Sequence, residues 1–425
     1  MIALAMARAP KDRNRAGAGV NQQSMTEVTT SKQDPTASPM LLVVAGASAA
    51  LFVANLYYAQ PLLTTIAKDL GLAHQFAGSV VSVSQLGYGL GLFLLVPLSD
   101  IVENRRLVLT CSALTLVGIV GMVLAQSAAA FLCFALMIGI FSSGAQILIP
   151  YLSHMIPDER RGRALGGIMA GILTSVMLAR PFALFIAAEW GWRSVYILSA
   201  AATASLGLAL WQMMLPRRPP ERIGYWRAIR SMFRLFASAA HVRRRTIYQA
   251  VLFGCFTMFW AAMPILLEEH FGFGMREVGL FALVGAGGVL AAPLAGRLAD
   301  RGAVRTGTVI ASLFVAGAFI CSFLSYHWAA PIGLVLASFV IDGSIQVSQV
   351  LSRIVVLDVP ADVRGRINAS YMTSIFLSGA VGSVLGVSVY YGAGWSAVAL
   401  IGMGSGLLVF LAALAERGHH GAITR

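Results

Sequence analysis

Twelve runs of about 20 mostly apolar residues limit what this chain can fold into. They cover residues 41–66, 76–99, 107–126, 129–154, 164–188, 192–215, 247–268, 277–299, 306–326, 328–352, 367–391 and 394–415. A helix of about 20 residues spans the roughly 30 Å of hydrocarbon in a bilayer. Because backbone N–H and C=O groups cannot stay unpaired in lipid, the runs must be helices rather than open strands. The sequence therefore predicts an all-α membrane protein with twelve transmembrane helices.

The composition agrees with a lipid-facing exterior. Hydrophobic residues make up 58% of the chain and charged residues 12%, whereas soluble domains carry about 25% charged residues. A soluble protein of this size needs a polar surface that this chain cannot supply.

The basic residues are distributed unevenly among the loops. All but four of the 31 Lys and Arg fall in the N-terminal tail, the even-numbered loops or the C-terminal tail; the exceptions are Lys68, Arg180, Arg193 and Arg276. Basic loops stay in the cytoplasm, so we expect a multi-pass protein of the cell inner (plasma) membrane with both termini cytoplasmic. The net charge of +13 reflects this topology, and since it forms no single patch we expect no nucleic-acid partner.

The chain repeats itself at an offset of about 203 residues. The sequence PDERRGR at 157–163 returns as PADVRGR at 360–366, and Gly191-Trp192 returns as Gly394-Trp395. Six helices duplicated as six helices form a parallel repeat, which predicts two pseudo-symmetric six-helix bundles (6 + 6). The expected division is a disordered cytoplasmic tail (1–38), an N-terminal bundle (39–215), a basic cytoplasmic linker with a possible amphipathic helix (216–246), a C-terminal bundle (247–415) and a cytoplasmic tail (416–425).

Two loops carry the residues of a family resemblance. The loop after the second span reads PLSDIVENRR over 97–106, and the loop after the eighth reads GRLADRGAVR over 296–305. Both resemble the major facilitator superfamily signature Gly-x-Leu-Ala-Asp-Arg with a downstream Arg. The second copy keeps Gly296, whereas the first has Val96 at that position. The resemblance covers residues 41–415 and implies a secondary transporter.

The resemblance also gives these loops a gating role. An Asp at the end of one helix can pair with basic residues at the start of the next, or with a helix N-terminus in the other half. We therefore expect state-dependent cytoplasmic latches, formed by Asp100 with Arg105 and Arg106 and by Asp300 with Arg301 and Arg305.

Two ionisable residues lie well inside predicted spans, Arg180 in the fifth and Asp342 in the tenth. An ionised group in hydrocarbon is costly, so such residues are functional candidates. We expect Arg180 to contact an anionic substrate or a partner group, and Asp342 to carry protons; the alternative is a structural ion pair or a hydrogen-bonded cap on a kinked helix.

A cavity is expected near the middle of the membrane. Residues 55–61, NLYYAQP, resemble those of bacterial drug- and metabolite-efflux members. The candidate cavity residues are polar or aromatic side chains within spans: Asn55, Tyr58, Gln60, Gln146, Phe259, Trp260 and Gln346. Dense glycines in the second, fifth, eighth and eleventh spans predict close helix contacts where the two halves meet.

Together these features predict proton-coupled export of a small organic compound by a monomer in a lipid bilayer. The alternatives are a proton-symporting metabolite importer and a non-transporting membrane receptor or scaffold. We expect no enzyme, because no Gly-rich phosphate loop or other catalytic motif occurs. We also expect no metal and no cofactor, with the proton gradient as the energy source.

Overall fold

The computed structural model describes residues 38–218, 224–360 and 363–416. The expected tails at 1–38 and 416–425 lie outside these ranges, apart from Ser38 and Glu416. The helices, in chain order, are α1 (Pro39–Ala54), η1 (Gln60–Leu62), α2 (Leu63–Asp69), η2 (His74–Phe76), α3 (Ser79–Leu94), η3 (Val96–Asp100), α4 (Asn104–Leu124), α5 (Ala128–Ser142), α6 (Gly144–Met155), α7 (Asp158–Trp190), α8 (Trp192–Met213), α9 (Tyr225–Ser238), α10 (Ala240–Glu269), α11 (Met275–Ala286), η4 (Gly287–Ala291), α12 (Ala292–Asp300), α13 (Val304–His327), α14 (Pro331–Val356) and α15 (Arg364–Leu414).

These elements form the twelve predicted spans, and the all-α fold class is confirmed. Within the described ranges no strand occurs, and nine helical stretches are long and apolar enough to cross a membrane. One of them, α15, supplies two spans because its helix turns sharply at Gly394. The first and eighth spans are each broken by a short 3-10 turn, η1 and η4.

The repeat is visible in the backbone at two glycines. Gly191 (φ 79°, ψ 162°) separates α7 from α8, and Gly394 (φ 75°, ψ 178°) separates the two parts of α15. A positive φ is costly for residues with a Cβ, so glycine allows each helical hairpin to reverse within one residue. The tryptophans that follow, Trp192 and Trp395, are both buried.

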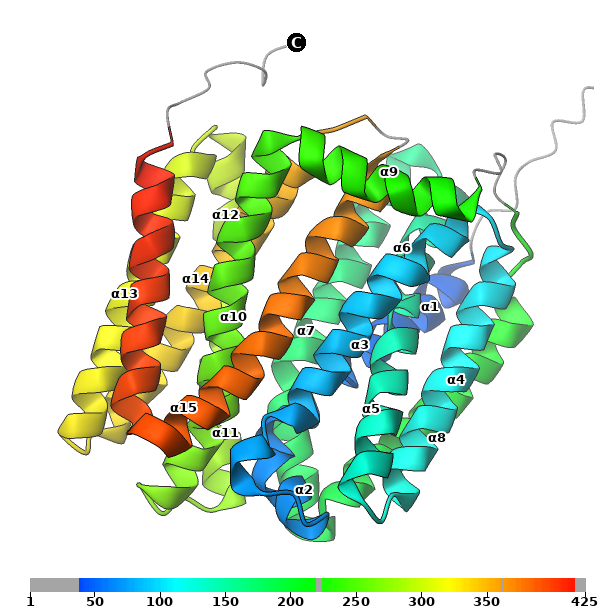
Figure 1. The fold of residues 1–425 in the computed structure, drawn as a ribbon. Coiled ribbons are helices and arrows are strands. Elements are labelled where there is room, and N and C mark those ends of the chain that lie inside the picture. Colours follow the sequence, from blue (N-terminus) through cyan, green and yellow to red (C-terminus); the bar gives the residue numbers. More distant parts are fainter. Residues whose placement is uncertain (1–37, 219–223, 361–362, 417–425) are drawn as a thin grey trace, which may run out of the picture. The chain divides into compact units, whose positions relative to one another are not determined.

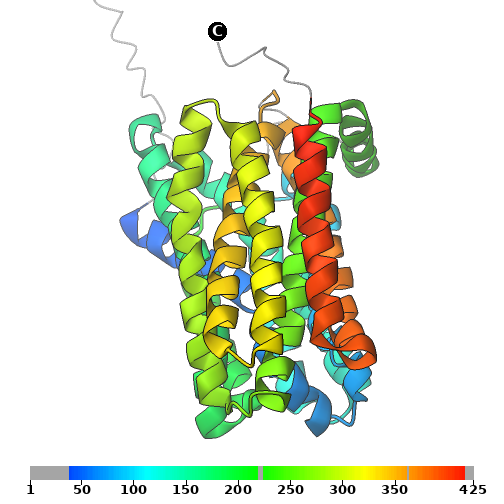
Figure 2. The same cartoon turned by 90° about the vertical axis from the view of Figure 1, so that its left-hand side faces the viewer.

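Two faces of the membrane bundle can be told apart. The basic face holds α9 and the adjoining ends of α7 and α14, and the opposite face holds α2, the turn between α7 and α8 and the turn within α15 (Figures 1 and 2). The spans run between these faces. On the basic face, α9 touches both halves: the Tyr225 hydroxyl donates to the Leu94 carbonyl (3.1 Å), and Arg366 donates to the Ser231 hydroxyl (2.8 Å).

Most of the glycines in these spans pack helices within a half. Gly89 and Gly379 instead lie between the halves, where the second span meets the eleventh as predicted. A Cβ on Gly87 would lie 2.4 Å from the Leu136 carbonyl oxygen of α5, and one on Gly382 would lie 2.1 Å from the Gly254 carbonyl oxygen of α10. By contrast, Gly167 of α7 has no atom within 4 Å of its Cβ position. Close backbone approach therefore makes each half stiff.

This packing gives a stability prediction for α15. Gly382→Ala should lower the free energy of unfolding by about 1–3 kcal/mol or more, because the new methyl group meets backbone that cannot easily move. Gly404→Ala is the matched control in the same helix, since nothing lies within 4 Å of its Cβ position. Thermal denaturation in detergent measures both variants, and equal melting temperatures would contradict the packing argument.

Candidate functional site

Arg180 and Asp342 meet in the interior of the bundle. Arg180 comes from α7 of the first half and Asp342 from α14 of the second, and they are 2% and 3% exposed. Arg180 Nη1 lies 3.8 Å from Asp342 Oδ2, longer than the 2.7–2.9 Å of a direct charge-assisted hydrogen bond. The two predicted intramembrane charges therefore form one loose ion pair across the two halves.

Arg180 is held from several sides. Its Nε donates to Gln60 Oε1 at 2.9 Å, and its guanidinium carbon lies 4.4 Å from the Trp260 ring centroid and 5.1 Å from that of Phe256. Aromatic faces attract a cation most strongly where water is excluded. Its Nη2 is buried without a hydrogen-bond partner among the described residues.

Asp342 is fixed by one strong hydrogen bond and by tight packing. The Trp260 indole N–H donates to Asp342 Oδ1 at 2.7 Å, so Trp260 touches both members of the pair. A Cβ on Gly288 would lie 3.0 Å from the Asp342 Cβ and 2.3 Å from the Phe339 carbonyl oxygen. Glycine at 288 thus lets η4 pack directly against the carboxylate-bearing turn of α14.

A cavity of about 250 Å³ adjoins the pair. Its walls come from both halves: Val53, Tyr57, Tyr88, Gln146, Ile149, Met169, Ile172, Leu173, Val176, Met177, Arg180, Phe253, Phe256, Asp342, Ile345, Gln346, Gln349, Val350, Arg353, Met372 and Phe376. Along α7 and α14 these residues run from the ion pair toward the ends of both helices at the basic face. The cavity therefore extends from the middle of the bundle toward that face.

The polar wall of the cavity is a stripe on α14. Asp342, Gln346, Gln349 and Arg353 follow one another at spacings of four, three and four residues, which places them on one helix face. Sequence reasoning singled out only the first two. Sequence reasoning missed Gln349, which lies inside the expected tenth span, and Arg353, which lies one residue beyond it. Their helical spacing from Asp342 and Gln346 is the signal that could have identified both.

The other cavity candidates divide into three groups. Gln146 lines the cavity and lies within hydrogen-bonding distance of the Tyr88 hydroxyl (3.4 Å). Gln60 and Trp260 instead support the ion pair from behind. The remaining three, Asn55, Tyr58 and Phe259, do not line this cavity.

Each of these three is buried against its own half. Asn55 accepts a hydrogen bond from Ser199, Tyr58 packs against the Phe182 ring, and Phe259 packs between Phe319 and Trp395. The neighbouring Tyr57, which sequence reasoning passed over, faces the cavity. Both tyrosines lie in the turn between α1 and η1, and of the two only Tyr57 is among the cavity-lining residues.

The arginines of the gating loops bind backbone carbonyls in this structure, whose cavity extends toward the basic face. Arg105 donates to the Trp211 carbonyl at 2.6 Å, and Arg305 donates to the Leu414 carbonyl at 2.6 Å. Arg105 and Arg305 therefore have equivalent roles in the two halves. Each donates to a backbone carbonyl that has no intrahelical partner at the end of the last helix of its half. Neither is a latch partner of the nearby Asp in this structure.

The remaining loop residues also behave asymmetrically. Arg106 is 75% exposed and pairs with Glu103 (3.4 Å), while Asp100 interacts electrostatically with Arg366 at the start of α15. Asp300 and Arg301 are exposed, Gly296 is partly buried, and no cation of the described residues lies within ion-pair distance of Asp300. The first loop therefore interacts with the other half through Asp100.

The opposite face is closed by contacts between the halves. Thr64 of α2 donates to Glu268 of α10 at 3.2 Å, and Ser383 of α15 donates to the Gly78 carbonyl at 3.1 Å. Glu189 of α7 pairs with Arg276 at the start of α11. Since the cavity extends only toward the basic face, the ion pair separates it from these contacts.

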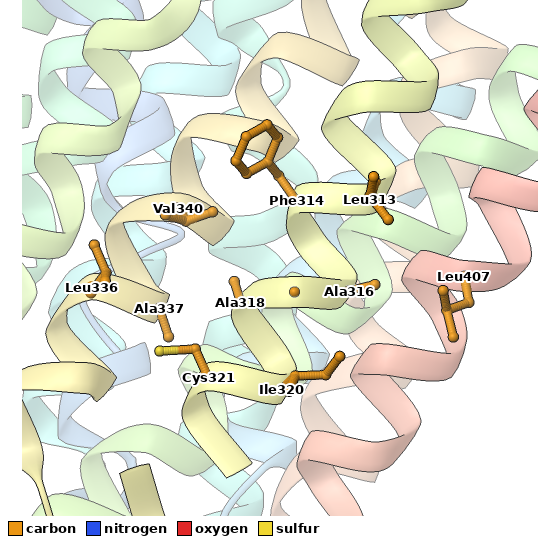
Figure 3. A pocket seen from close by; sticks show the side chains of 11 residues that line it. Leu313, Phe314, Ala316, Ala318, Ile320, Cys321, Leu336, Ala337, Val340 and Leu407 are labelled. Atoms are coloured by element: carbon orange, nitrogen blue, oxygen red, sulfur yellow. The ribbon is translucent and has the colours of Figure 1, made fainter. Parts of the chain in front are cut away.

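A second concavity, of about 440 Å³, lies between α13, α14 and the end of α15 (Figure 3). Its walls are apolar side chains such as Phe314, Leu336 and Leu407, with the Cys321 thiol as the one sulfur group among its lining residues. Exposed apolar surface of this kind faces lipid in a membrane protein. None of its lining residues is charged, so this concavity is not the candidate site.

Two six-helix halves around a central cavity with buried charges define a secondary transporter fold. The family model of the Major Facilitator Superfamily matches residues 44–352 and 246–422. The chain belongs to this superfamily, as the loop signature predicted.

Individual relatives agree with the family. "Uncharacterized transporter YgaY" of Escherichia coli O157:H7 is 33% identical over 366 residues, covering 86% of this chain and 92% of its own. "Probable transporter SCO4007" of Streptomyces coelicolor is 30% identical, covering 86% and 85%. The crystal structure of a D-xylose-proton symporter matches with a TM-score of 0.71 at 15% identity, over 87% of this chain and 96% of that one; at this identity it shows the fold alone.

The ion pair gives a second stability prediction. Arg180→Met or Asp342→Asn alone should destabilise the protein by about 3–5 kcal/mol, because each leaves a buried charge without its partner. The double variant should lose much less than the sum of the two. Melting temperatures of the three variants in detergent complete the cycle, and strictly additive losses would show that the pair does not interact.

Proposed function

We propose that this transporter is proton-coupled. Asp342 carries the proton, and Arg180 neutralises the ionised Asp342 carboxylate between transport steps. The observation that supports this most directly is the Arg180–Asp342 pair, buried between the two halves where the cavity ends. A carboxylate at this position can be reached from one face and then the other as the halves rock. Protonation of Asp342 changes the net charge of the ion pair that is buried between the two halves.

The proposed orientation follows from the loop charges. Basic loops favour the cytoplasmic side, so we place the basic face, both termini and the cavity mouth in the cytoplasm of a bacterial-type inner membrane. A monomer is sufficient for this scheme, since both members of the charge pair lie in one chain.

Export of a small organic compound in exchange for protons is the first form of this function. The first span resembles those of efflux members, and in the proposed orientation the cavity is accessible from the side on which an exporter loads. Its walls of Phe, Tyr, Met and amide side chains suit an amphipathic compound.

Proton symport is the second form, and one observation favours it. Arg180 Nη2 has no hydrogen-bond partner among the described residues although it is buried beside Asp342. A guanidinium with an unused donor can take a negatively charged substrate group while a proton neutralises the carboxylate.

Proton flux in liposomes tests the function itself. Asp342→Asn should abolish substrate-driven proton movement, because the amide cannot carry the proton, while the folded variant still binds substrate. Reconstituted protein with a pH-sensitive dye inside the vesicles measures the flux for hits from a ligand thermal-shift screen.

Asp358→Asn is the matched control for this experiment. It makes the same chemical change just beyond the end of α14 and outside the cavity lining, so it should keep the flux. Undiminished proton flux in Asp342→Asn would remove this residue from the coupling mechanism.

A further inference from the structure

We infer that the cavity binds a small organic monoanion, such as a monocarboxylate with an apolar body, together with one proton. This inference rests on the proposed proton coupling and selects its symport form. It concerns the charge of the substrate and the sign of the coupling, and it follows from the hydrogen bonds, charges and walls of the cavity.

The hydrogen-bond donors around the pair outnumber the acceptors. Arg180 has five N–H groups, of which Nε is used by Gln60 and Nη1 points to Asp342 at 3.8 Å. Both Arg180 Nη2 and Gln60 Nε2 are buried without partners among the described residues. Buried donors are normally satisfied, so the missing component is an acceptor.

The charge of the cavity points the same way. Its lining contains two guanidinium groups, Arg180 and Arg353, against one carboxylate, Asp342. Arg353 lies about 16 Å along α14 from Asp342, at 1.5 Å per residue, so a ligand at the ion pair faces Arg180 alone. Once Asp342 is protonated, the ionised ligand that neutralises Arg180 is a monoanion. A carboxylate also matches the planar fork of Arg geometrically, because its two oxygens accept two parallel N–H bonds.

The walls restrict the rest of the ligand. Aromatic rings and methionines, among them Phe253, Phe256, Met169 and Met372, surround the part of the cavity away from the ion pair. A volume of about 250 Å³ lies just below the usual range of roughly 300–1,000 Å³ for ligand pockets. These features fit a small, mostly apolar body with one charged end.

The proton follows from charge balance at the pair. With Asp342 ionised, Arg180 and Asp342 together are neutral, and an anion would add an uncompensated charge to a water-poor interior. Protonation of Asp342 restores neutrality and frees Arg180 for the anion. Binding of the anion therefore favours binding of the proton, and the reverse holds by linkage.

The groups that face Asp342 agree with this linkage. They are Arg180 from α7, Trp260 from α10 and the Tyr57 hydroxyl from the end of the first span, while η4 contributes only the glycine at 288. Arg180 is the one cation among these facing groups. Its engagement by an anion is therefore the event that changes the proton affinity of Asp342.

The sign of the coupling is a direct consequence. An anion and a proton that bind cooperatively cross the membrane in the same direction, whereas a cation would compete with the proton for Asp342 and exchange against it. The empty carrier returns with its ion pair re-formed and no net charge at the site.

Binding to the detergent-purified full-length protein tests the inference. The probes are benzoate and hexanoate, each compared with its neutral amide and its amine. In weakly buffered solution, above the pH at which Asp342 titrates in the free protein, each bound carboxylate should take up one proton, and its apparent Kd should rise up to tenfold per pH unit. Titration calorimetry and a pH-indicator dye measure the two quantities.

Three variants separate the roles of the charges. Asp342→Asn should bind carboxylates with no proton uptake and a flat pH dependence. Arg180→Met should lose carboxylate binding by at least 100-fold, while Arg227→Met, the same change at an exposed arginine of α9 outside the cavity lining, should bind normally. The folded state of each variant is checked by its melting temperature.

The outcomes distinguish this inference from the proposed function. Binding of the amines with proton release, failure of every carboxylate to bind, or proton uptake that persists in Asp342→Asn overturns the inference. Substrate-driven proton flux opposite to the substrate leaves proton coupling intact and overturns symport of an anion. Proton uptake on binding without flux in liposomes supports the anion site and overturns the transport proposal.

Discussion

A guanidinium and a carboxylate that are both shielded from water constrain everything around them. Arg180 and Asp342 come from different halves of the chain, so the charge of each is neutralised only while the halves approach each other in the middle of the bundle. Trp260 strengthens this arrangement by placing its ring against the cation and its N–H on the anion. If the halves move apart, each buried charge needs a new partner or must be neutralised. Relative movement of the halves therefore depends on the charge state of Arg180 and Asp342.

The packing of the halves supports the same conclusion. Within each half, glycines such as Gly139 and Gly382 bring helix backbones into direct contact, with Cβ positions only 2.2 and 2.1 Å from carbonyl oxygens of the neighbouring helix. Between the halves, several contacts are single side-chain hydrogen bonds, such as Thr373 to the Gly89 carbonyl at 3.2 Å. Bonds of this kind contribute about 1 kcal/mol each. Two stiff bodies with an exchangeable interface suit rigid-body rocking.

The sequence predicted the features that depend on composition and period. Twelve spans, two halves and the selection of Arg180 and Asp342 as exceptional buried charges all follow from the cost of polar groups in lipid. Partners could not be predicted, because they depend on helix rotation and on contacts between distant segments. The choice of Tyr58 over Tyr57 was wrong by one residue in the turn after α1, and the partner of Arg105 is a backbone carbonyl that leaves no signature in the sequence.

The repeat explains why the charge pair occurs once. At the offset of 203, Arg180 corresponds to Ser383, which bonds the Gly78 carbonyl across the interface, and Asp342 corresponds to Gly139, which packs against the backbone of α3. Each half thus keeps one charge and uses the equivalent position for packing. A symmetric pair of sites would place two cations and two anions in one interior, with twice the desolvation cost. Divergence of the halves therefore leaves the duplicated bundle with one ion pair between them.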